Sequence, residues 1–292
     1  FRNGCYWLSL LNRMVAVIIC SVDSQRVAEL QENIEKTIGF PHEVIVFDNR
    51  EEKSGLCAVY NRCAERAAGE VLLFLHEDIL FYSCGWGGIL FGKAMEQETG
   101  VIGFAGSSYK SRTESGWMSL RPFVHSHLTE KGVRIGMNDN KDDFCEVSVI
   151  DGLALAVRKS VWERIRFDEA VFPGFHGYDL DFSFAVSLEY RNYVCTSIEL
   201  EHFSRGSFNA AWWESCKCFH RKWADILPYS VKALTAEEIE DTERKIERKT
   251  TYLLVKNRLD NRNYRRRRLL HLLRREPFNP HNIELLFKYW IG

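Results

Sequence analysis

The chain has 292 residues, of which 46% are hydrophobic and 27% charged, a composition typical of a globular protein with a large core. These values exclude a disordered chain, a collagen-like repeat and a disulfide-stapled miniprotein. The net charge of −1 hides an uneven distribution. Residues 231–292 hold 15 Lys and Arg against 9 Asp and Glu, whereas residues 1–230 hold 24 against 31. An acidic body therefore precedes a basic C-terminal extension.

Nine cysteines occur without a C-x-x-C pair, and several lie inside apolar runs. This pattern favours reduced core cysteines over a disulfide framework or a zinc site, so we expect a cytoplasmic protein. The best candidate for a membrane span, residues 5–22, is interrupted by Asn12 and Arg13, and we predict no transmembrane helix. Residues 1–13 are predicted to be a leader or an added segment, because the first clear strand follows Met14.

The first 75 residues alternate strand and helix patterns. Residues 15–20 form an unbroken apolar run rich in β-branched side chains, which predicts a strand buried on both faces and therefore a parallel sheet. The pattern then predicts a helix at residues 25–38, a second buried strand at 43–47, another helix at 56–68 and a third strand at 71–75. This order predicts an α/β fold in which helices cover a mainly parallel sheet.

The rest of the chain is less regular. We predict a short helix at residues 89–95, a strand at 101–105 and a loop-like region at 106–140. A strand-like block follows at 147–157, then helices at 160–165 and 182–190 and a strand at 194–200. Thr235 and Glu238 predict a capping box at the start of a long charged helix. The predicted domains are residues 14–228 and a basic helical extension from 229 to 292.

Polar residues follow each of the first three predicted strands: Ser21, then Asp48 and Asn49, then His76, Glu77 and Asp78. Ligands of open α/β sheets bind beyond the carboxyl ends of the strands, so we expect these side chains to meet in one crevice. A carboxylate and an imidazole two positions apart can both reach one divalent cation, Mn²⁺ or Mg²⁺. His202, after a later strand, is a third candidate ligand. The alternative is that these residues are solvated loop residues or helix caps.

Asp179 and Asp181 lie at the start of a predicted helix. The backbone N–H groups there stabilise carboxylates, so capping explains one of the two residues but not both. We predict that one of them acts as a general base toward a hydroxyl while the other is structural.

In this order the residues resemble the nucleotide-sugar-dependent glycosyltransferases of the GT-A fold, in particular the inverting family 2. The resemblance covers roughly residues 14–228 and rests on the strand before Ser21, Asp48–Asn49, residues 54–61, residues 76–78, Asp151–Gly152 and His202. Two positions depart from the family pattern. His76 stands where the family has the first Asp of an Asp-x-Asp motif, and Tyr178 stands where it has the Glu of a Glu-Asp pair.

The resemblance implies a hexosyl- or related transferase that moves a sugar from a nucleotide diphosphate, a UDP-sugar first, to a hydroxyl of a sugar or lipid-linked acceptor, with inversion. It also implies a role in bacterial surface polysaccharide or glycolipid synthesis. Asp78, His76 and His202 would hold Mn²⁺ or Mg²⁺, and Asp179 would be the base, with Asp181 a second acidic position. The nucleotide-sugar site would comprise Ser21, Asp48, Asn49, Asn61, His76, Glu77, Asp78, Asp151 and Gly152.

Two other functions stay open. A nucleotidyltransferase-like enzyme would need a glycine-rich phosphate loop after the first strand, and residues 20–24 contain no glycine. A catalytically silent nucleotide- or sugar-binding protein would fit the departures at His76 and Tyr178. A calorimetric screen of nucleotide diphosphates with and without Mn²⁺ separates these readings.

The remaining features concern partners. Six aromatic residues are candidates for a sugar-binding platform, with core packing as the alternative: Trp117, Phe123, Phe175, Tyr178, Trp212 and Trp213. The extension is predicted to be a solvated or oligomerising helix first, and a contact with anionic lipid at the inner membrane face second. Nucleic acid ranks last, because the body is acidic and carries no recognised reading module.

Overall fold

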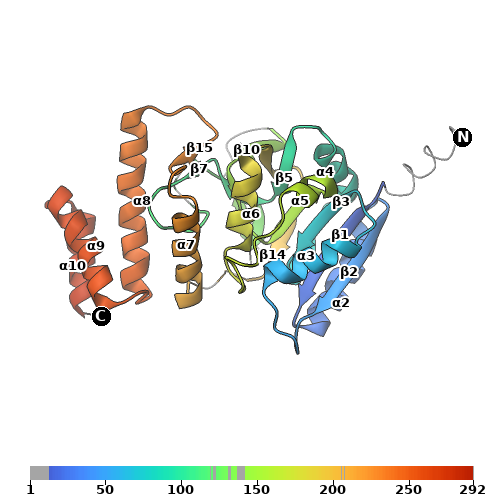
Figure 1. The fold of residues 1–292 in the computed structure, drawn as a ribbon, viewed down its shortest axis with the longest axis horizontal. Coiled ribbons are helices and arrows are strands. Elements are labelled where there is room, and N and C mark those ends of the chain that lie inside the picture. Colours follow the sequence, from blue (N-terminus) through green and yellow to red (C-terminus); the bar gives the residue numbers. More distant parts are fainter. Residues whose placement is uncertain are drawn as a thin grey trace, which may run out of the picture.

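A computed structural model describes residues 13–118, 120, 123–130, 133–136, 142–204, 206 and 208–291. The predicted leader therefore lies outside the described residues, except for Arg13. A central sheet flanked by helices forms one end of the molecule, and the helices of the extension form the other end (Figure 1).

The central sheet has seven strands in the order β10-β13-β5-β12-β3-β1-β2. In chain order these are β1 (Val15–Ser21), β2 (His42–Asp48), β3 (Val71–Leu75), β5 (Thr99–Gly103), β10 (Phe144–Val147), β12 (Ala154–Arg158) and β13 (Arg191–Cys195). The strands β1, β2 and β3 are parallel, as are β5 and β13, whereas β12 is antiparallel to both of its neighbours. The prediction of a mainly parallel sheet is confirmed.

Helices cover both faces of this sheet. On β1, Val15, Val17 and Ile19 belong to one core, which α2 (Ser24–Thr37) and α4 (Trp86–Ala94) cover. Ala16 and Ile18 face the other core, covered by α3 (Leu56–Arg66), α5 (Lys159–Arg164) and α6 (Tyr178–Ser187). An unbroken apolar run is what such a two-faced environment requires, because successive side chains point to opposite faces.

The expectation that the second strand is buried was wrong. β2 lies at the edge of the sheet, none of its residues is fully buried, and Val46 is 38% exposed. Its apolar run does not distinguish an edge strand from a central one, since the position of a strand in the sheet depends on its partners.

A second sheet occupies part of the region predicted to be a loop. It consists of β4 (Ile79–Phe81), β6 (Ala105–Ser107), β8 (Val124–Glu130), β11 (Val149–Ile150) and β14 (Leu200–His202), with β9 (Val133–Gly136) paired to β8. The predicted strand at 147–157 is thus divided among β10, β11 and β12, and the strand at 194–200 is divided between β13 and β14. These breaks follow from pairing with distant strands, which hydropathy alone does not reveal.

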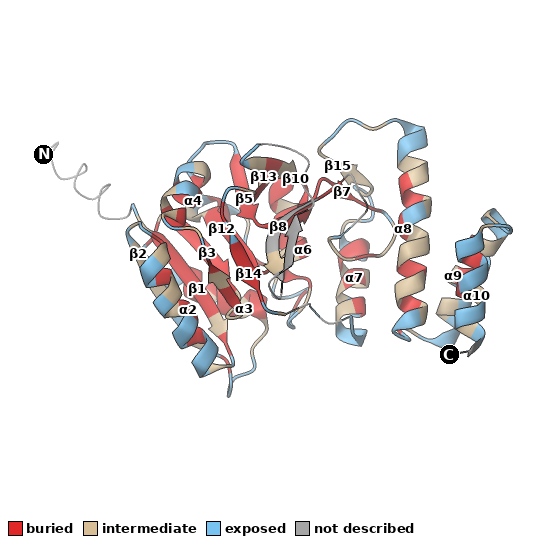
Figure 2. Ribbon diagram, turned by 180° about the vertical axis from the view of Figure 1, so that it is seen from behind, coloured by how far each residue is buried: buried red, intermediate tan, exposed pale blue. Residues whose placement is uncertain are grey.

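The extension packs on α7 (Ala210–Lys222), the last helix of the body. It begins with β15 (Tyr229–Ser230), which pairs with β7 (Tyr109–Lys110), and continues with α8 (Ala236–Lys256), α9 (Arg262–Arg275) and α10 (Pro280–Ile291). The predicted capping box of Thr235 and Glu238 is confirmed. Buried residues recur along α8 (Figure 2), and Leu254 of that helix packs with Trp213 of α7. The domain division at residue 229 stays a prediction.

None of the helices in the described ranges combines the length and apolarity that crossing a bilayer requires.

Candidate active site

The carboxyl ends of β1, β2 and β3 lie at one edge of the central sheet, because the three strands are parallel and Ser21 is in register with Asp48. A cleft of about 720 Å³ opens beside this edge. The predicted residues that line it are Asn49, His76, Glu77, Asp78, Asp151, Gly152, Asp179 and His202. The expected crevice is therefore present, and it contains most of the predicted site.

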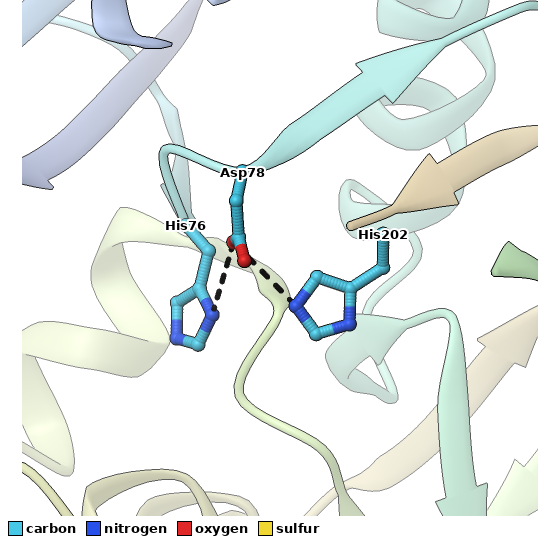
Figure 3. A group of neighbouring side chains, drawn as sticks. All are labelled: His76, Asp78 and His202. Carbon is cyan, nitrogen blue, oxygen red and sulfur yellow. Dashed lines mark ion pairs between the residues drawn. The ribbon is translucent and has the colours of Figure 1, made fainter. Parts of the chain in front are cut away.

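His76, Asp78 and His202 point toward one another across the cleft (Figure 3). Asp78 Oδ1 lies 3.5 Å from His202 Nε2 and 3.9 Å from His76 Nδ1. One ligand atom from each residue lies within 4.8 Å of the others, as the ligands of a single cation would. The predicted ligand set is thus brought together from the end of β3 and the last residue of β14.

Asp78 is held in its ionised form. Burial opposes the charge, but hydrogen bonds from His202 and the Ser204 hydroxyl, together with the nearby imidazoles, outweigh it and hold the pKa of Asp78 well below its usual range. Burial in turn lowers the pKa of His76, which favours its neutral, ligand-competent form. One carboxylate and two imidazoles are ligand types that fit a divalent cation such as Mn²⁺.

Glu77 has a different position from its neighbours. Its Oε2 accepts hydrogen bonds from the Ser21 hydroxyl at 2.6 Å and from the backbone N–H groups of Val22 and Asp23 at 3.1 Å. Glu77 thereby ties the end of β3 to the end of β1. Its carboxylate shapes the cleft by fixing these two strand ends.

Asp179 lies in the first turn of α6, which begins at Tyr178 and not at Phe182 as predicted. Its Oδ2 accepts a hydrogen bond of 3.0 Å from the backbone N–H of Gly152. Burial and, secondarily, the charge of Asp151 raise the pKa of Asp179 to about 7. A carboxylate with such a pKa is suited to accept a proton near neutral pH.

Asp181 does not share this environment, although it is only two residues away. Its Oδ2 accepts from the Lys222 ammonium at 2.8 Å and its Oδ1 from the Trp223 indole at 2.8 Å. Asp181 is 2% exposed and is not among the residues that line the cleft. The structure therefore brings Asp179, and not Asp181, to the cleft.

Three predicted nucleotide-site residues also lie outside the cleft lining: Ser21, Asp48 and Asn61. Asp48 is exposed and forms a bidentate ion pair with Arg50. Asn61 is buried, donates to the Phe167 carbonyl at 2.9 Å and accepts from the Trp162 indole at 3.3 Å. Asn61 therefore joins α3 to the segment around α5.

Tyr178 links the two departures from the family pattern. Its hydroxyl donates to the Gly152 carbonyl at 2.9 Å and lies 2.7 Å from His76 Nε2. A Cβ on residue 152 would come within 2.1 Å of the Tyr178 hydroxyl oxygen, so only glycine allows this approach. The ring of Tyr178 is fixed by an edge-to-face contact with the ring of Tyr60, with the two ring centroids 5.6 Å apart.

Of the six candidate platform aromatics, Trp117, Phe175, Tyr178 and Trp212 line the cleft. Phe123 and Trp213 are buried elsewhere. Sequence reasoning missed other lining residues, among them Arg26, Met118, His176, Ser204 and Phe208. The sequence signals for these were the proximity of Ser204 to His202, the position of His176 beside Phe175, and the position of Arg26 in the first turn of the helix that follows β1.

Comparisons with known proteins concern the whole cleft-bearing region. Residues 16–225 match the family model described as "Glycosyltransferase like family". A search of the curated proteins found no match. Two solved structures are similar in fold at 14% identity. The mannosyltransferase PcManGT from Pyrobaculum calidifontis, in complex with GDP-Man and Mn²⁺, has a TM-score of 0.51, covering 95% of this chain and 79% of that one.

The second structure is S. aureus TarS 1–349 in complex with UDP, with a TM-score of 0.50, covering 80% of this chain and 70% of that one. GalNAc-T7 with UDP, GalNAc and Mn²⁺ has 10% identity and a TM-score of 0.48. The match covers 70% of this chain but only 48% of GalNAc-T7, so this chain spans about half the length of that protein.

Proposed function

The chain belongs to the glycosyltransferase-like family and has the GT-A fold, and from this premise we propose that it transfers a sugar from a nucleotide-diphosphate donor to an acceptor hydroxyl with inversion. One observation carries the proposal: Asp179 and the His76, Asp78 and His202 cluster open into the same cleft. A UDP-sugar is the first donor to test. The proposed acceptor is a sugar or lipid-linked hydroxyl in surface polysaccharide or glycolipid synthesis.

Asp179 is the proposed general base. Its carboxylate accepts the proton of the acceptor hydroxyl as that oxygen attacks the anomeric carbon, while the bond from that carbon to the diphosphate oxygen breaks. The Gly152 N–H holds one carboxylate oxygen at 3.0 Å and so orients the group. Attack from the side opposite the leaving group inverts the anomeric carbon in a single displacement.

Asp78, His76 and His202 are the proposed ligands of a divalent cation. The ion would neutralise the charge that develops on the diphosphate, as metal-assisted displacement requires. Asp78 keeps its charge for this purpose because His202 and Ser204 hydrogen-bond to it. The donor set favours Mn²⁺ over Mg²⁺, since two of the three ligands are nitrogen.

The lining of the cleft supports a division into two walls. One wall lies at the ends of β1, β2 and β3 and includes Cys20, Val22, Arg26, Asn49 and Asp78. We place the nucleotide there and call this the nucleotide wall. Trp117, Phe175 and Trp212 form the opposite wall, and their apolar ring faces suit the C–H faces of a pyranose.

The decisive experiment compares the wild-type protein with Asp179→Asn. Calorimetry with UDP and GDP, each with and without Mn²⁺, measures donor-side binding, and a transfer assay measures turnover. We expect the variant to bind nucleotide within about twofold of wild type while transfer falls by at least about a hundredfold, the usual contribution of a general base. An active Asp179→Asn enzyme would remove Asp179 from this role. Absence of any nucleotide binding by the wild type would favour a silent protein.

The extension carries a surface of a different kind. Ile283, Phe287 and Trp290 lie on one face of α10, and Phe287 and Trp290 are 62% and 68% exposed. On the neighbouring α9, four exposed arginines form no ion pair with any residue that the structure describes: Arg262, Arg266, Arg267 and Arg274. We propose that this surface contacts anionic lipid, because exposed aromatic residues beside unpaired arginines suit the membrane interface.

Vesicle co-sedimentation tests this surface. We expect binding to vesicles with phosphatidylglycerol but not to neutral ones, and at least about a tenfold loss in the variant Phe287→Ser with Trp290→Ser. Met95→Ser, which removes an exposed apolar side chain from the body, is the matched control. If the surface instead joins two copies, light scattering will show a dimer that the double variant dissociates, and vesicle binding will be absent.

A further inference from the structure

Tyr178 and His76 are 102 positions apart, and each replaces an acidic residue that the family resemblance would lead one to expect. The structure places them in direct contact, with the Tyr178 hydroxyl 2.7 Å from His76 Nε2. Tyr178 is 4% exposed, and its ring is held by Tyr60 and Phe167. The hydroxyl is therefore in a fixed position and cannot turn away from the imidazole.

The Gly152 carbonyl decides the direction of this hydrogen bond. A phenol has one proton, and a carbonyl oxygen can only accept, so the 2.9 Å contact between them uses the Tyr178 proton. The phenolic oxygen is then available to His76 only as an acceptor. Nε2 of His76 must therefore carry the proton of the neutral imidazole.

This arrangement leaves Nδ1 of His76 with its lone pair. Nδ1 is the ring nitrogen that faces Asp78, 3.9 Å from Oδ1, on the side of the ligand cluster (Figure 3). The opposite tautomer would direct an N–H at the cation position and would leave the buried Gly152 carbonyl without this donor. The second ring nitrogen of a metal-binding histidine commonly sets the tautomer in this way.

We infer that Tyr178 is a positioning residue that sets the tautomer of His76 for cation binding, with the Gly152 carbonyl fixing the direction of the hydrogen bond. The inference rests on the proposed cation site. The N–H of the same residue, Gly152, also holds Asp179, so one turn orients both a cation ligand and the proposed base. The two departures from the family pattern are thus a compensating pair.

The tautomer can be read directly in the metal-free protein of 292 residues. Long-range ¹H–¹⁵N correlation spectra of histidine-labelled protein at pH 8 distinguish Nε2–H from Nδ1–H, and His76→Gln assigns the signal. We expect the Nε2–H form in wild type and a mixture of tautomers in Tyr178→Phe, which keeps the ring and removes only the hydroxyl. Tyr229→Phe is the control, because its hydroxyl donates to the Ser187 carbonyl, a contact in which His76 takes no part.

Calorimetric Mn²⁺ titration then tests the consequence for the site. We expect Tyr178→Phe to weaken Mn²⁺ binding by about tenfold, the lower end of the effect of such outer partners, and to weaken it no further in a His76→Ala background. Thermal unfolding of each variant identifies any general loss of structure.

The outcomes are distinguishable. If wild type binds Mn²⁺ but Tyr178→Phe changes neither the tautomer nor the affinity, the inference is wrong while the proposed function stands. If wild type binds no Mn²⁺, or His76→Ala binds it equally well, the cation site itself is wrong and the inference with it. An equal loss from Tyr178→Phe in both backgrounds shows that Tyr178 does not act through His76.

Discussion

The two walls of the cleft are built in different ways. The nucleotide wall consists of the ends of parallel strands, and its polar residues follow β1, β2 and β3 directly; Glu77 joins two of these ends. The opposite wall consists of the segment 109–118, the loop before α6 that carries Phe175, and α7, which have no such shared edge. It is supported by residues of the basic extension.

Glu243 of α8 shows how the extension supports this wall. Its buried carboxylate accepts hydrogen bonds from the Tyr109 and Ser111 hydroxyls and from the backbone N–H of Arg112, at 2.6, 2.7 and 3.0 Å. The Lys110 ammonium is likewise buried and donates to the Ser115 carbonyl at 3.0 Å, and burial lowers the pKa of Lys110 to about 7. The extension differs from the body in charge, yet it forms part of the support of the cleft.

The difference between the two walls predicts that substitutions in the nucleotide wall abolish sugar transfer while the protein keeps its fold. Asp78→Asn should lower transfer by about a thousandfold, since a charge-stabilising cation supplies several kcal/mol. Its thermal unfolding should change little, because the isosteric amide keeps the volume. Glu65→Gln, an exposed carboxylate on α3, is the control and should be active. A fully active Asp78→Asn would contradict the role of this wall.

The pH dependence of transfer tests Asp179, which lines the cleft together with both walls. Burial, then the charge of Asp151, raises the pKa of Asp179 to about 7, so the carboxylate is largely protonated below that pH and cannot accept a proton. We expect transfer to fall about tenfold per unit below pH 7, and so about a hundredfold at pH 5. A rate that stays constant from pH 5 to 8 would mean that Asp179 does not titrate in this range or is not the base.

Substitutions that weaken the support of the opposite wall should instead lower the free energy of unfolding and weaken acceptor binding. Glu243→Ala leaves several buried donors without an acceptor and should destabilise the protein by about 2–4 kcal/mol. The KM for the acceptor should rise, while calorimetric affinity for nucleotide stays within about twofold. Glu240→Ala removes an exposed carboxylate from the same helix and should lower the free energy of unfolding far less. Equal effects of the two substitutions in urea unfolding would refute the supporting role of Glu243.

The smallest effect on activity is expected from a substitution of Asp181, and it distinguishes the role of this carboxylate from that of Asp179 on the same helix. Asp181→Asn keeps the contact with Trp223 but weakens the pairing with Lys222, so it should destabilise by about 1–2 kcal/mol. Transfer should fall by no more than a few-fold, against the large loss expected for Asp179→Asn. Unfolding curves and steady-state rates of the two variants check this, and a comparable loss of turnover would restore Asp181 to the catalytic set.

Much of the fold follows from local pattern. The unbroken run at residues 15–20, the helical spacing after it and the capping box at Thr235 are properties of neighbouring residues, and each is found where predicted. The strands β6, β8 and β9 were not predicted. β8 and β9 pair with each other as neighbours in the chain, whereas β6 pairs with β8 and β11, and β8 also pairs with β14 far along the chain.

The choice between Asp179 and Asp181 illustrates the limit of prediction from local sequence pattern. On a helix, residues two apart point in directions that differ by about 200°, so both cannot face one cleft. The sequence shows this only if the start of the helix is known, and the start was predicted four residues late. The partners that hold Asp181, Lys222 and Trp223, lie more than 40 positions away.

The sequence by itself determined the α/β pattern, the family and the set of polar residues at the ends of the parallel strands. It could do so because burial periodicity is local and parallel strands share one edge. The tertiary structure decided which carboxylate faces the cleft, that Tyr178 meets His76, and that Glu243 supports the opposite wall. These contacts join segments about 27 to 134 positions apart, and only the packing of the whole chain brings such segments together.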